Sequence, residues 1–274
     1  MIAINNHIIQ LEKFGDGTLK CSAIDPNVLN DVGFVCDPQI TWAYDDDAEL
    51  FALCCIAREA RELYQGFMTL CLPYIPHARQ DRKVSDRLFT LKTFAQILNS
   101  LKFDKVYVFD PHSDVSMALI DNVELIEPTF FTMMKSRPKG YDAIMFPDAG
   151  ASKKYGKDNE SKLPVIIGNK HRNEEGRIES YDLLGFPEGV KSVMIIDDIC
   201  SYGGTFVAAA KALREKGVEK ISLVVSHCEN NILKGEVFDY IDEVYTSDSI
   251  CTVEHPKLFV QKLFRNAMEG LYNV

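Results

Sequence analysis

The sequence predicts an α/β protein made of two halves, each built on a doubly wound parallel sheet. Short apolar runs typical of buried strands alternate with amphipathic stretches of helical period through most of the 274 residues. Two such series meet near residue 137, so we expect one half at 1–136 and another at 137–274, with the last helix packing back on the first half. Polar residues follow several strands, and the carboxyl ends of parallel strands share one edge of a sheet. We therefore expect functional side chains at these junctions and a cleft between the halves.

The first half opens with a weakly alternating arm and continues as strands and helices. Acidic residues 45–47 precede its strongest helix, where negative charge is favourable against the helix dipole. In chain order, the expected elements are an arm at 2–13, a turn at 14–18, a helix at 49–65, a strand at 67–75, a polar loop at 76–83, a helix at about 91–101, a strand at 105–113 and a helix at 115–120.

The second half repeats this alternation. The charged segment 173–182 lies between two of its strands, and we expect it to be a mobile lid. The expected strands and helices are strands at 143–150, 164–172, 193–200, 221–228 and 243–250, a helix at 206–216, and an amphipathic helix from about 257.

Composition describes an ordinary soluble globular protein, with 46% hydrophobic and 26% charged residues. A net charge of −10 argues against a general nucleic-acid surface. The sequence has no basic, apolar leader at its start and no apolar run long enough to span a membrane. Its eight cysteines form no CxxC pair, which favours free thiols in a reducing cytoplasm over a zinc site.

The stretch KSVMIIDDICSYGGTF, residues 191–206, combines the parts of a binding site for a sugar phosphate. Its apolar run reads as a buried strand, after which come Asp197 and Asp198, two glycines and a helix opened by Thr205. Backbone N–H groups at a helix start hold phosphate, and glycines let the main chain approach it. The carboxylates can accept hydrogen bonds from a ribose diol, directly or through Mg²⁺. No Walker motif is present, and the plainer alternative is a surface turn with a stray acidic pair.

Other strand ends of the predicted sheets carry polar residues in the same way. One such group could be a solvated loop, but several at one edge of a sheet indicate a site. These groups are the run 79–83, the pair Asp110 and His112, Asp148, the pair Lys170 and Arg172, and the pair Asp197 and Asp198.

These motifs, in this order, resemble the ribose-phosphate diphosphokinases, the enzymes that make phosphoribosyl diphosphate (PRPP). The matching segments are LCLPYIPHARQDR, TLKTFAQILNS, VFDPHS, PDAG, KHR, IIDDICSYGGT and TSDSI, of which ARQDR is the most specific. The resemblance extends from about Phe14 to the end of the chain. It implies a type I phosphoribosyltransferase-like fold for both halves. Type I phosphoribosyltransferases themselves share the acidic motif but are not expected to carry the other segments.

The resemblance also implies a role for each matching residue. ATP would be bound by Phe14, Asp16, Arg79, Gln80, Asp81 and His112, with Phe14 and Asp16 serving a neighbouring subunit. Mg²⁺ would be held by His112 and Asp148. Lys170 and Arg172 would be catalytic, neutralising the diphosphoryl group during transfer. The sugar phosphate would be bound by Asp197, Asp198, Ser201, Tyr202, Gly203, Gly204 and Thr205.

The reaction implied is attack of the anomeric hydroxyl of ribose 5-phosphate on the β-phosphorus of ATP, giving PRPP and AMP for nucleotide or NAD synthesis. Such a transfer asks the protein for alignment and charge neutralisation by Mg²⁺, Lys and Arg. Because Phe14 would serve a neighbouring subunit, the resemblance also implies a homo-oligomer, either a dimer or a ring built from dimers.

The chain departs from the family pattern in three places. The segment before FGDGT is short, Thr18 replaces an acidic residue, and Ser201-Tyr202 stands where the family's DTAGT loop begins. A carboxylate is thus replaced and an aromatic ring added where the 5-substituent of the sugar lies. We therefore retain alternatives: a larger acceptor such as ADP-ribose in NAD salvage, a non-catalytic member that binds partner enzymes, and, more distantly, a plain phosphoribosyltransferase.

Overall fold

The chain divides into two compact units, Met1–Pro128 with Lys262–Val274, and Thr129–Gln261. The computed structural model describes residues 1–30, 38–128, 140–156, 163–172 and 178–268. The expected boundary between residues 136 and 137 lies outside these ranges. Residues from Lys262 onward return to the first unit, where Arg265 Nη2 donates to Asp45 Oδ1 at 2.7 Å and to Tyr44 O at 2.9 Å.

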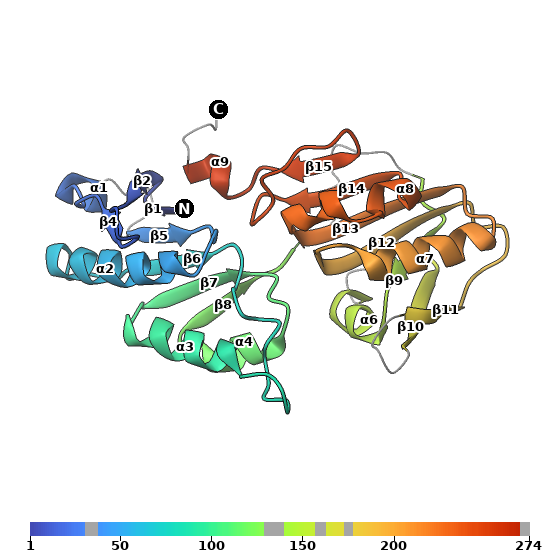
Figure 1. The fold of residues 1–274 in the computed structure, drawn as a ribbon, viewed down its shortest axis with the longest axis horizontal. Helices are drawn as coiled ribbons and strands as arrows, with labels where there is room; N and C mark the ends of the chain where they lie inside the picture. Colours follow the sequence, from blue (N-terminus) through green and yellow to red (C-terminus); the bar gives the residue numbers. More distant parts are fainter. Residues whose placement is uncertain (31–37, 129–139, 157–162, 173–177, 269–274) are drawn as a thin grey trace. The chain divides into compact units, whose positions relative to one another are not determined.

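The first unit contains a six-stranded sheet in the order β2-β1-β5-β6-β7-β8 and a separate hairpin, β3-β4 (Figure 1). Strands β5 to β8 are parallel, whereas β1 is antiparallel to β2 and to β5. Its elements are β1 Ile2–Ile4, β2 His7–Ile9, β3 Leu11–Lys13, β4 Leu19–Cys21, α1 Pro26–Asn30, β5 Gln39–Trp42, α2 Ala48–Leu63, β6 Thr69–Leu72, α3 Thr90–Ser100, β7 Lys105–Phe109, α4 Asp114–Leu119, β8 Val123–Ile126 and α9 Arg265–Met268.

Helices cover one face of the first sheet. Buried residues of α2 and α3, among them Leu53 and Phe94, pack with strand residues such as Ile40 and Leu70 in one core, and α4 lies against the same core. In a second, smaller cluster, Met268 of α9 packs with Ala3 of β1 and with Ala43, which follows β5. The period of apolar residues in α2 and α3 thus buries one stripe of each helix against the sheet.

The second unit contains a seven-stranded sheet in the order β11-β10-β9-β12-β13-β14-β15. All neighbouring strands are parallel except β10 and β11. Its elements are β9 Ala143–Phe146, α6 Ala149–Tyr155, β10 Val165–Arg172, β11 Ile178–Leu184, β12 Ser192–Cys200, α7 Gly204–Glu215, β13 Lys220–Cys228, the 3₁₀ helix η2 Asn230–Lys234, α8 Val237–Tyr240, β14 Glu243–Ser247 and β15 Leu258–Gln261.

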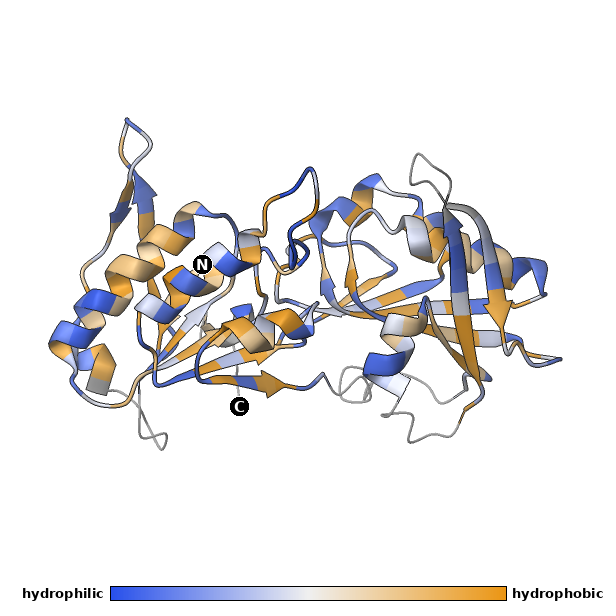
Figure 2. Cartoon of the chain, turned by 90° about the horizontal axis from the view of Figure 1, so that it is seen from below, coloured by the Kyte–Doolittle hydropathy of each residue, from blue (hydrophilic) through white to orange (hydrophobic). Residues whose placement is uncertain are grey.

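The second sheet is doubly wound, and its strand order reverses between β9 and β12. From β9 the chain passes through α6 to β10 on one side, and from β12 it passes through α7 to β13 on the other. Residues of α7 and α6 accordingly pack in separate cores on opposite faces of the sheet. Figure 2 shows the apolar strands and the apolar stripes of the helices. Ligands of open α/β sheets bind at such a reversal, so the fold points to the carboxyl ends of β9 and β12.

The parallel sheets confirm the predicted α/β class, but some elements differ from expectation. Strand β12 runs to Cys200, so Asp197 and Asp198 lie within the strand rather than after it. Leu258–Gln261 is a strand paired with β14, not the start of a helix from residue 257. In the expected lid, residues 178–182 belong to β11, which pairs with β10, and residues 173–177 lie outside the described ranges.

The cysteines of the described ranges are all free: Cys21, Cys54, Cys55, Cys71, Cys200, Cys228 and Cys251. Most are buried or half-buried, and only Cys55 is exposed. Among the helices of these ranges, none combines the length and the apolar character that crossing a membrane requires.

Candidate active site

The turn between β12 and α7 has the form of a phosphate-binding turn. Gly203 caps α7 in the left-handed conformation with φ 78°, and a Cβ there would lie 2.0 Å from Val237 Cγ2. Both the backbone and the packing therefore require glycine. Val207 N donates to Gly203 O at 2.9 Å, and the N–H groups just before it point out of the helix end, where they and the helix dipole favour an anion. The predicted contacts Ser201, Tyr202, Gly203, Gly204 and Thr205 all lie on this turn or on the first turn of α7.

Two carboxylates lie next to each other in β12, just before this turn. Asp198 is buried, with 6% of its surface exposed, and its N–H donates to Asp197 Oδ1 at 3.0 Å. Burial, followed by repulsion from Asp198, raises the pKa of Asp197 to about 8. At neutral pH the pair therefore keeps a proton. A ligand that offers hydroxyl donors or positive charge relieves this repulsion, which suits the expected ribose diol.

Asp148, at the end of β9, forms an ion pair with Lys170 of β10. Its Oδ2 accepts from Lys170 Nζ at 2.9 Å, and its Oδ1 caps α6 by accepting from Ala151 N at 3.0 Å. Burial acts to raise the pKa of Asp148, but the hydrogen bonds from Ala151, Lys170 and the Gly150 main chain, together with the charge of Lys170, lower it overall. The charge of Asp148 is also among the causes that raise the pKa of Asp197. The structure thus brings Asp148, Lys170, Asp197 and Asp198 together at the strand reversal.

Tyr181 belongs to the same group, although the sequence did not single it out. Its hydroxyl donates to Pro147 O at 2.8 Å. Burial, followed by the charges of Asp148 and Asp197, raises the pKa of Tyr181. Gly168 makes room for this ring, because a Cβ there would lie 2.0 Å from the Tyr181 hydroxyl oxygen. Of the predicted residues, Arg172 ends β10, but its side chain lies outside the described part of the structure.

Substituting Asp197 with Asn should stabilise the protein above neutral pH. Folding raises the pKa of the Asp197 carboxyl. Between about pH 4 and the folded pKa, the folded state therefore binds more protons than the unfolded state. As a result, the stability of the protein falls as pH rises through that window. Asn removes this loss. We expect the thermal midpoint of Asp197→Asn to exceed that of the wild type by on the order of 5 °C at about pH 8 and to match it near pH 4. A lower midpoint for the variant at pH 8 would contradict the pKa assignment.

In the first unit, Asp81 joins the polar run after β6 to the end of β7. Ser113 Oγ donates to Asp81 Oδ2 at 2.7 Å, and Arg82 donates from Nε and Nη2 at 2.8 and 3.1 Å. The hydrogen bonds from Arg82, followed by the one from Ser113, lower the pKa of Asp81 to about 2 against the effect of burial. His112, exposed beside Ser113, adds to this lowering. The predicted residues Asp81 and His112 are therefore neighbours, and Ser113 is a contact that sequence reasoning missed, although its position before α4 carries an N-cap signal.

The remaining predicted ATP contacts lie on the same loop and on the hairpin. Arg79 and Gln80 are exposed, and Gln80 Oε1 accepts from Thr90 Oγ1 at 2.8 Å. Phe14 and Asp16 form the tip of the hairpin β3-β4, where Asp16 Oδ1 accepts from Thr18 N at 3.0 Å and Thr18 Oγ1 at 2.7 Å. Phe14 is 55% exposed. The Phe14 ring is therefore largely exposed to solvent at this turn.

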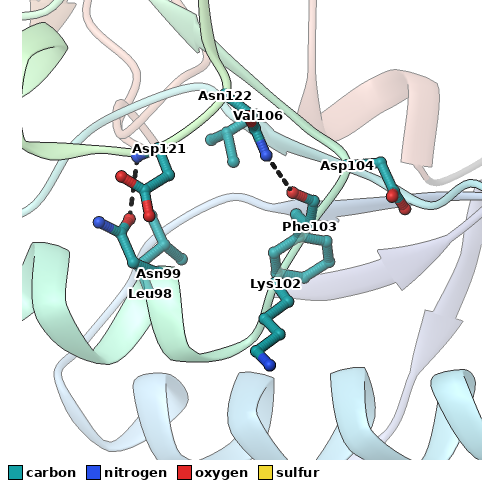
Figure 3. A pocket seen from close by; sticks show the side chains of 8 residues that line it. All are labelled: Leu98, Asn99, Lys102, Phe103, Asp104, Val106, Asp121 and Asn122. Atoms are coloured by element: carbon teal, nitrogen blue, oxygen red, sulfur yellow. Dashed lines mark hydrogen bonds between the residues drawn. The ribbon is translucent and has the colours of Figure 1, made fainter.

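A pocket of about 280 Å³ lies between residues 98–106 and residues 121–122 (Figure 3). It is at the amino ends of β7 and β8, the opposite edge of the first sheet from Asp81 and His112. Its polar groups bond to neighbouring protein atoms, as Asn122 Nδ2 does to Phe103 O at 3.0 Å and Asn99 Oδ1 does to Asp121 N at 3.0 Å. This pocket is therefore part of a structural loop network and not of the candidate active site.

The donor set for Mg²⁺ is incomplete without substrate. Within the described ranges, no three His, Cys, Asp or Glu side chains gather so that they alone could hold a metal ion. Mg²⁺ in phosphate enzymes is bound through one or two carboxylates together with substrate oxygens and water. Asp148, and the pair Asp197 and Asp198, fit that arrangement. His112 is the weaker candidate, because Mg²⁺ prefers oxygen to the nitrogen of an imidazole.

Comparisons with known proteins agree with this architecture. A model of the phosphoribosyl transferase domain matches residues 140–256, which hold β9 to β14 and the turn after β12. The fold also resembles the crystal structure of phosphoribosylpyrophosphate synthetase from Mycobacterium smegmatis, with a TM-score of 0.74 over 93% of this chain and 86% of that one, at 18% identity. The fold and the strand-end site together define an α/β protein of the type I phosphoribosyltransferase kind.

Relatives that match both units give the family. The chain is 30% identical over 252 residues to ribose-phosphate pyrophosphokinase of Marinomonas sp. (strain MWYL1), covering 87% of this chain and 77% of that protein. It is 28% identical to the protein of the same name from Vibrio cholerae, over 88% of this chain and 78% of that one. The chain therefore belongs to the ribose-phosphate pyrophosphokinase family of enzymes, which confirms the predicted resemblance to ribose-phosphate diphosphokinases.

Proposed function

We propose that this enzyme transfers the diphosphoryl group of ATP to the anomeric hydroxyl of ribose 5-phosphate, giving PRPP and AMP. The observation that carries the proposal is the group at the reversal between β9 and β12. There a phosphate-binding turn, a carboxylate pair and a lysine gather at one edge of one sheet. A sugar phosphate needs an anion site and diol acceptors, and a transferred phosphoryl group needs a cation.

Each part of this group has a distinct task in the proposed reaction. The turn 201–205 binds the 5-phosphate through backbone N–H groups, and Asp197 and Asp198 accept hydrogen bonds from the ribose hydroxyls. The oxygen of the C1 hydroxyl then bonds to the β-phosphorus and its proton is lost to solvent, while the bond from the β-phosphorus to the α,β-bridging oxygen breaks and AMP departs with that oxygen. Lys170, with Arg172 on the same strand, neutralises the charge that spreads over the transferring oxygens.

The first unit supplies the ATP contacts in this proposal. Arg79, Gln80 and Asp81 with His112 hold the nucleotide, and the hairpin tip with Phe14 and Asp16 serves the ATP of a second copy of the chain. Asp148, with His112 as the weaker candidate, would hold Mg²⁺ together with the substrate phosphates, and the bound ion would act as a Lewis acid that offsets phosphate charge. We also propose that the enzyme is a homo-oligomer, a dimer or a ring of dimers, that acts in the cytoplasm.

A larger acceptor such as ADP-ribose is a second candidate, favoured by the surroundings of the turn. The Tyr202 side chain is 55% exposed. At Gly204, a Cβ would meet no described atom within 4 Å. The turn thus has open space beside an exposed aromatic ring, on which the base of a nucleoside can stack. Ribose 5-phosphate would leave that ring unused.

An assay of AMP release with each acceptor separates the two candidates. If ribose 5-phosphate is the acceptor, it should give the higher kcat/KM, and Tyr202→Ala should change its KM by less than about 2-fold. If ADP-ribose is the acceptor, Tyr202→Ala should raise its KM by about 10-fold, the effect of losing one stacked base. Phe51→Ala, which removes another exposed aromatic ring, serves as control. Turnover with neither sugar would reject the proposed reaction and favour a non-catalytic role in binding partner enzymes.

A further inference from the structure

The segment Glu229–Val237, which we call the brace, touches three successive residues of the phosphate-binding turn. Ser201 Oγ donates a hydrogen bond to Glu229 Oε2. At Gly235, a Cβ would lie 2.0 Å from Tyr202 O, so the two main chains approach closely there. The third contact is between Val237 and Gly203, because Val237 Cγ2 leaves no room for a Cβ at Gly203. The turn is therefore held from one side by a separate stretch of chain.

The brace is itself fixed by bonds that do not involve the turn. Asn230 Nδ2 donates to Thr252 Oγ1 at 2.7 Å, and Thr252 N donates to Asn230 Oδ1 at 3.0 Å. Asn230 lies just after the carboxyl end of β13, and Thr252 lies after the carboxyl end of β14. Asn231 Nδ2 donates to Glu229 Oε2 at 3.3 Å, which orients the carboxylate toward Ser201. The brace thus has the rigidity needed to impose a geometry on the turn.

Glu229 joins the brace to the end of β12 through its main chain and its side chain. Its N–H donates to Cys200 O at 2.8 Å. Its carboxylate accepts a hydrogen bond from the hydroxyl of Ser201, the residue that follows Cys200. Cys200 and Cys228 are register partners in β12 and β13, so these bonds extend the pairing of the two strands into the turn. A hydrogen bond to a charged acceptor is stronger than one between neutral groups.

We propose that Glu229 is a positioning residue for the sugar phosphate: it holds Ser201 and thereby fixes the turn before ligand arrives. This inference rests on the proposed function of the turn. A serine hydroxyl can donate only one hydrogen bond, and the Ser201 hydroxyl donates it to Glu229. Ser201 therefore shapes the turn and does not donate to the phosphate. The phosphate is bound by the main-chain N–H groups, whose directions depend on the turn staying in place. Pre-organisation of this kind lowers the KM for the sugar phosphate.

A double-substitution cycle tests the link between the two side chains. Glu229→Gln keeps an acceptor for Ser201, and we expect its sugar-phosphate KM to stay within about 3-fold of wild type. Ser201→Asp places two carboxylates against each other and should raise this KM by at least about 10-fold. In the double variant the glutamine amide can donate to the new carboxylate, and the KM should return to within about 3-fold of wild type. The KM for ATP and the kcat should change by less than about 2-fold throughout.

Hydrogen exchange of the turn amides gives a readout that does not depend on turnover. Glu229→Ala should speed exchange at residues 201–206 by about 10-fold, with strand amides of β13 and β14 unchanged. As a control, Glu219→Ala removes an exposed glutamate that pairs with Lys191 at the other end of the sheet. It should change neither the sugar-phosphate KM nor the exchange at residues 201–206. Absence of rescue in the double variant, or unchanged exchange in Glu229→Ala, overturns the inference. If the exchange results hold but neither sugar is turned over, the positioning role stands and the proposed function fails.

Discussion

Replacing Lys170 with alanine should lower the rate of AMP release by about 10²- to 10³-fold, the usual effect of removing one charge-stabilising group from a transfer reaction. Lys170 Nζ lies 2.9 Å from Asp148 Oδ2, so its ammonium is positioned at the strand reversal where the phosphoryl group is expected. Because the charge it offsets is largest in the transition state, we expect kcat to fall and the KM for the sugar phosphate to change little. Steady-state measurement of AMP release over a range of sugar-phosphate concentrations gives both quantities.

Lys220→Ala is the matched control for this prediction. Lys220 lies in the same unit at the amino end of β13, where its Nζ is 3.2 Å from Glu243 Oε2. The control removes an equal charge from the opposite edge of the sheet and should keep the wild-type rate. If Lys170→Ala and Lys220→Ala behave alike, Lys170 does not act on the transferring group.

Gly203→Ala should both destabilise the second unit and remove sugar-phosphate binding. A left-handed backbone costs an L-residue about 1–2 kcal/mol, and the added methyl group would lie 2.0 Å from Val237 Cγ2, inside van der Waals contact. Overpacking of this kind adds about 1–3 kcal/mol. We therefore expect a loss of about 2–5 kcal/mol in the free energy of unfolding, measured by urea denaturation.

Gly217→Ala separates the two causes of that loss. Gly217 has φ 84°, close to the value at Gly203, but a Cβ there would meet no described atom within 4 Å. It should show the backbone cost alone, about 1–2 kcal/mol. Equal losses for the two variants would mean that Val237 yields to the new methyl group. A larger loss for Gly203→Ala supports a turn that is held rigidly by the segment against it.

Period and spacing were sufficient to predict the α/β class and most of the strands. The runs 193–200 and 221–228 are apolar enough to be buried on both faces, and helix α3 shows a clear apolar stripe. The end of the chain was predicted less well. Residues 258–261 form a strand because β14 offers an edge to pair with, and a single sequence does not reveal that partner.

For the candidate site, local motifs indicated residues near the carboxyl ends of strands and gave no indication of residues whose partners are distant along the chain. Asp148 follows β9, whereas Lys170 and the pair Asp197 and Asp198 lie within β10 and β12, near their carboxyl ends. Tyr181 was not recognised because its charged sequence neighbours resemble a solvated loop, although its hydroxyl donates a hydrogen bond to Pro147 O. Glu229 gave no signal, since its partner Ser201 is 28 residues earlier in the chain.

The proton shared by the acidic pair in β12 makes ligand binding an acid–base event. Burial and the adjacent Asp198 raise the pKa of Asp197, so the unliganded pair holds a proton to a higher pH than a free carboxyl does. A sugar diol or a cation that favours the fully ionised pair must expel that proton to solvent. If the pair binds the acceptor as proposed, we expect the affinity for the acceptor to rise with pH, because binding releases this proton.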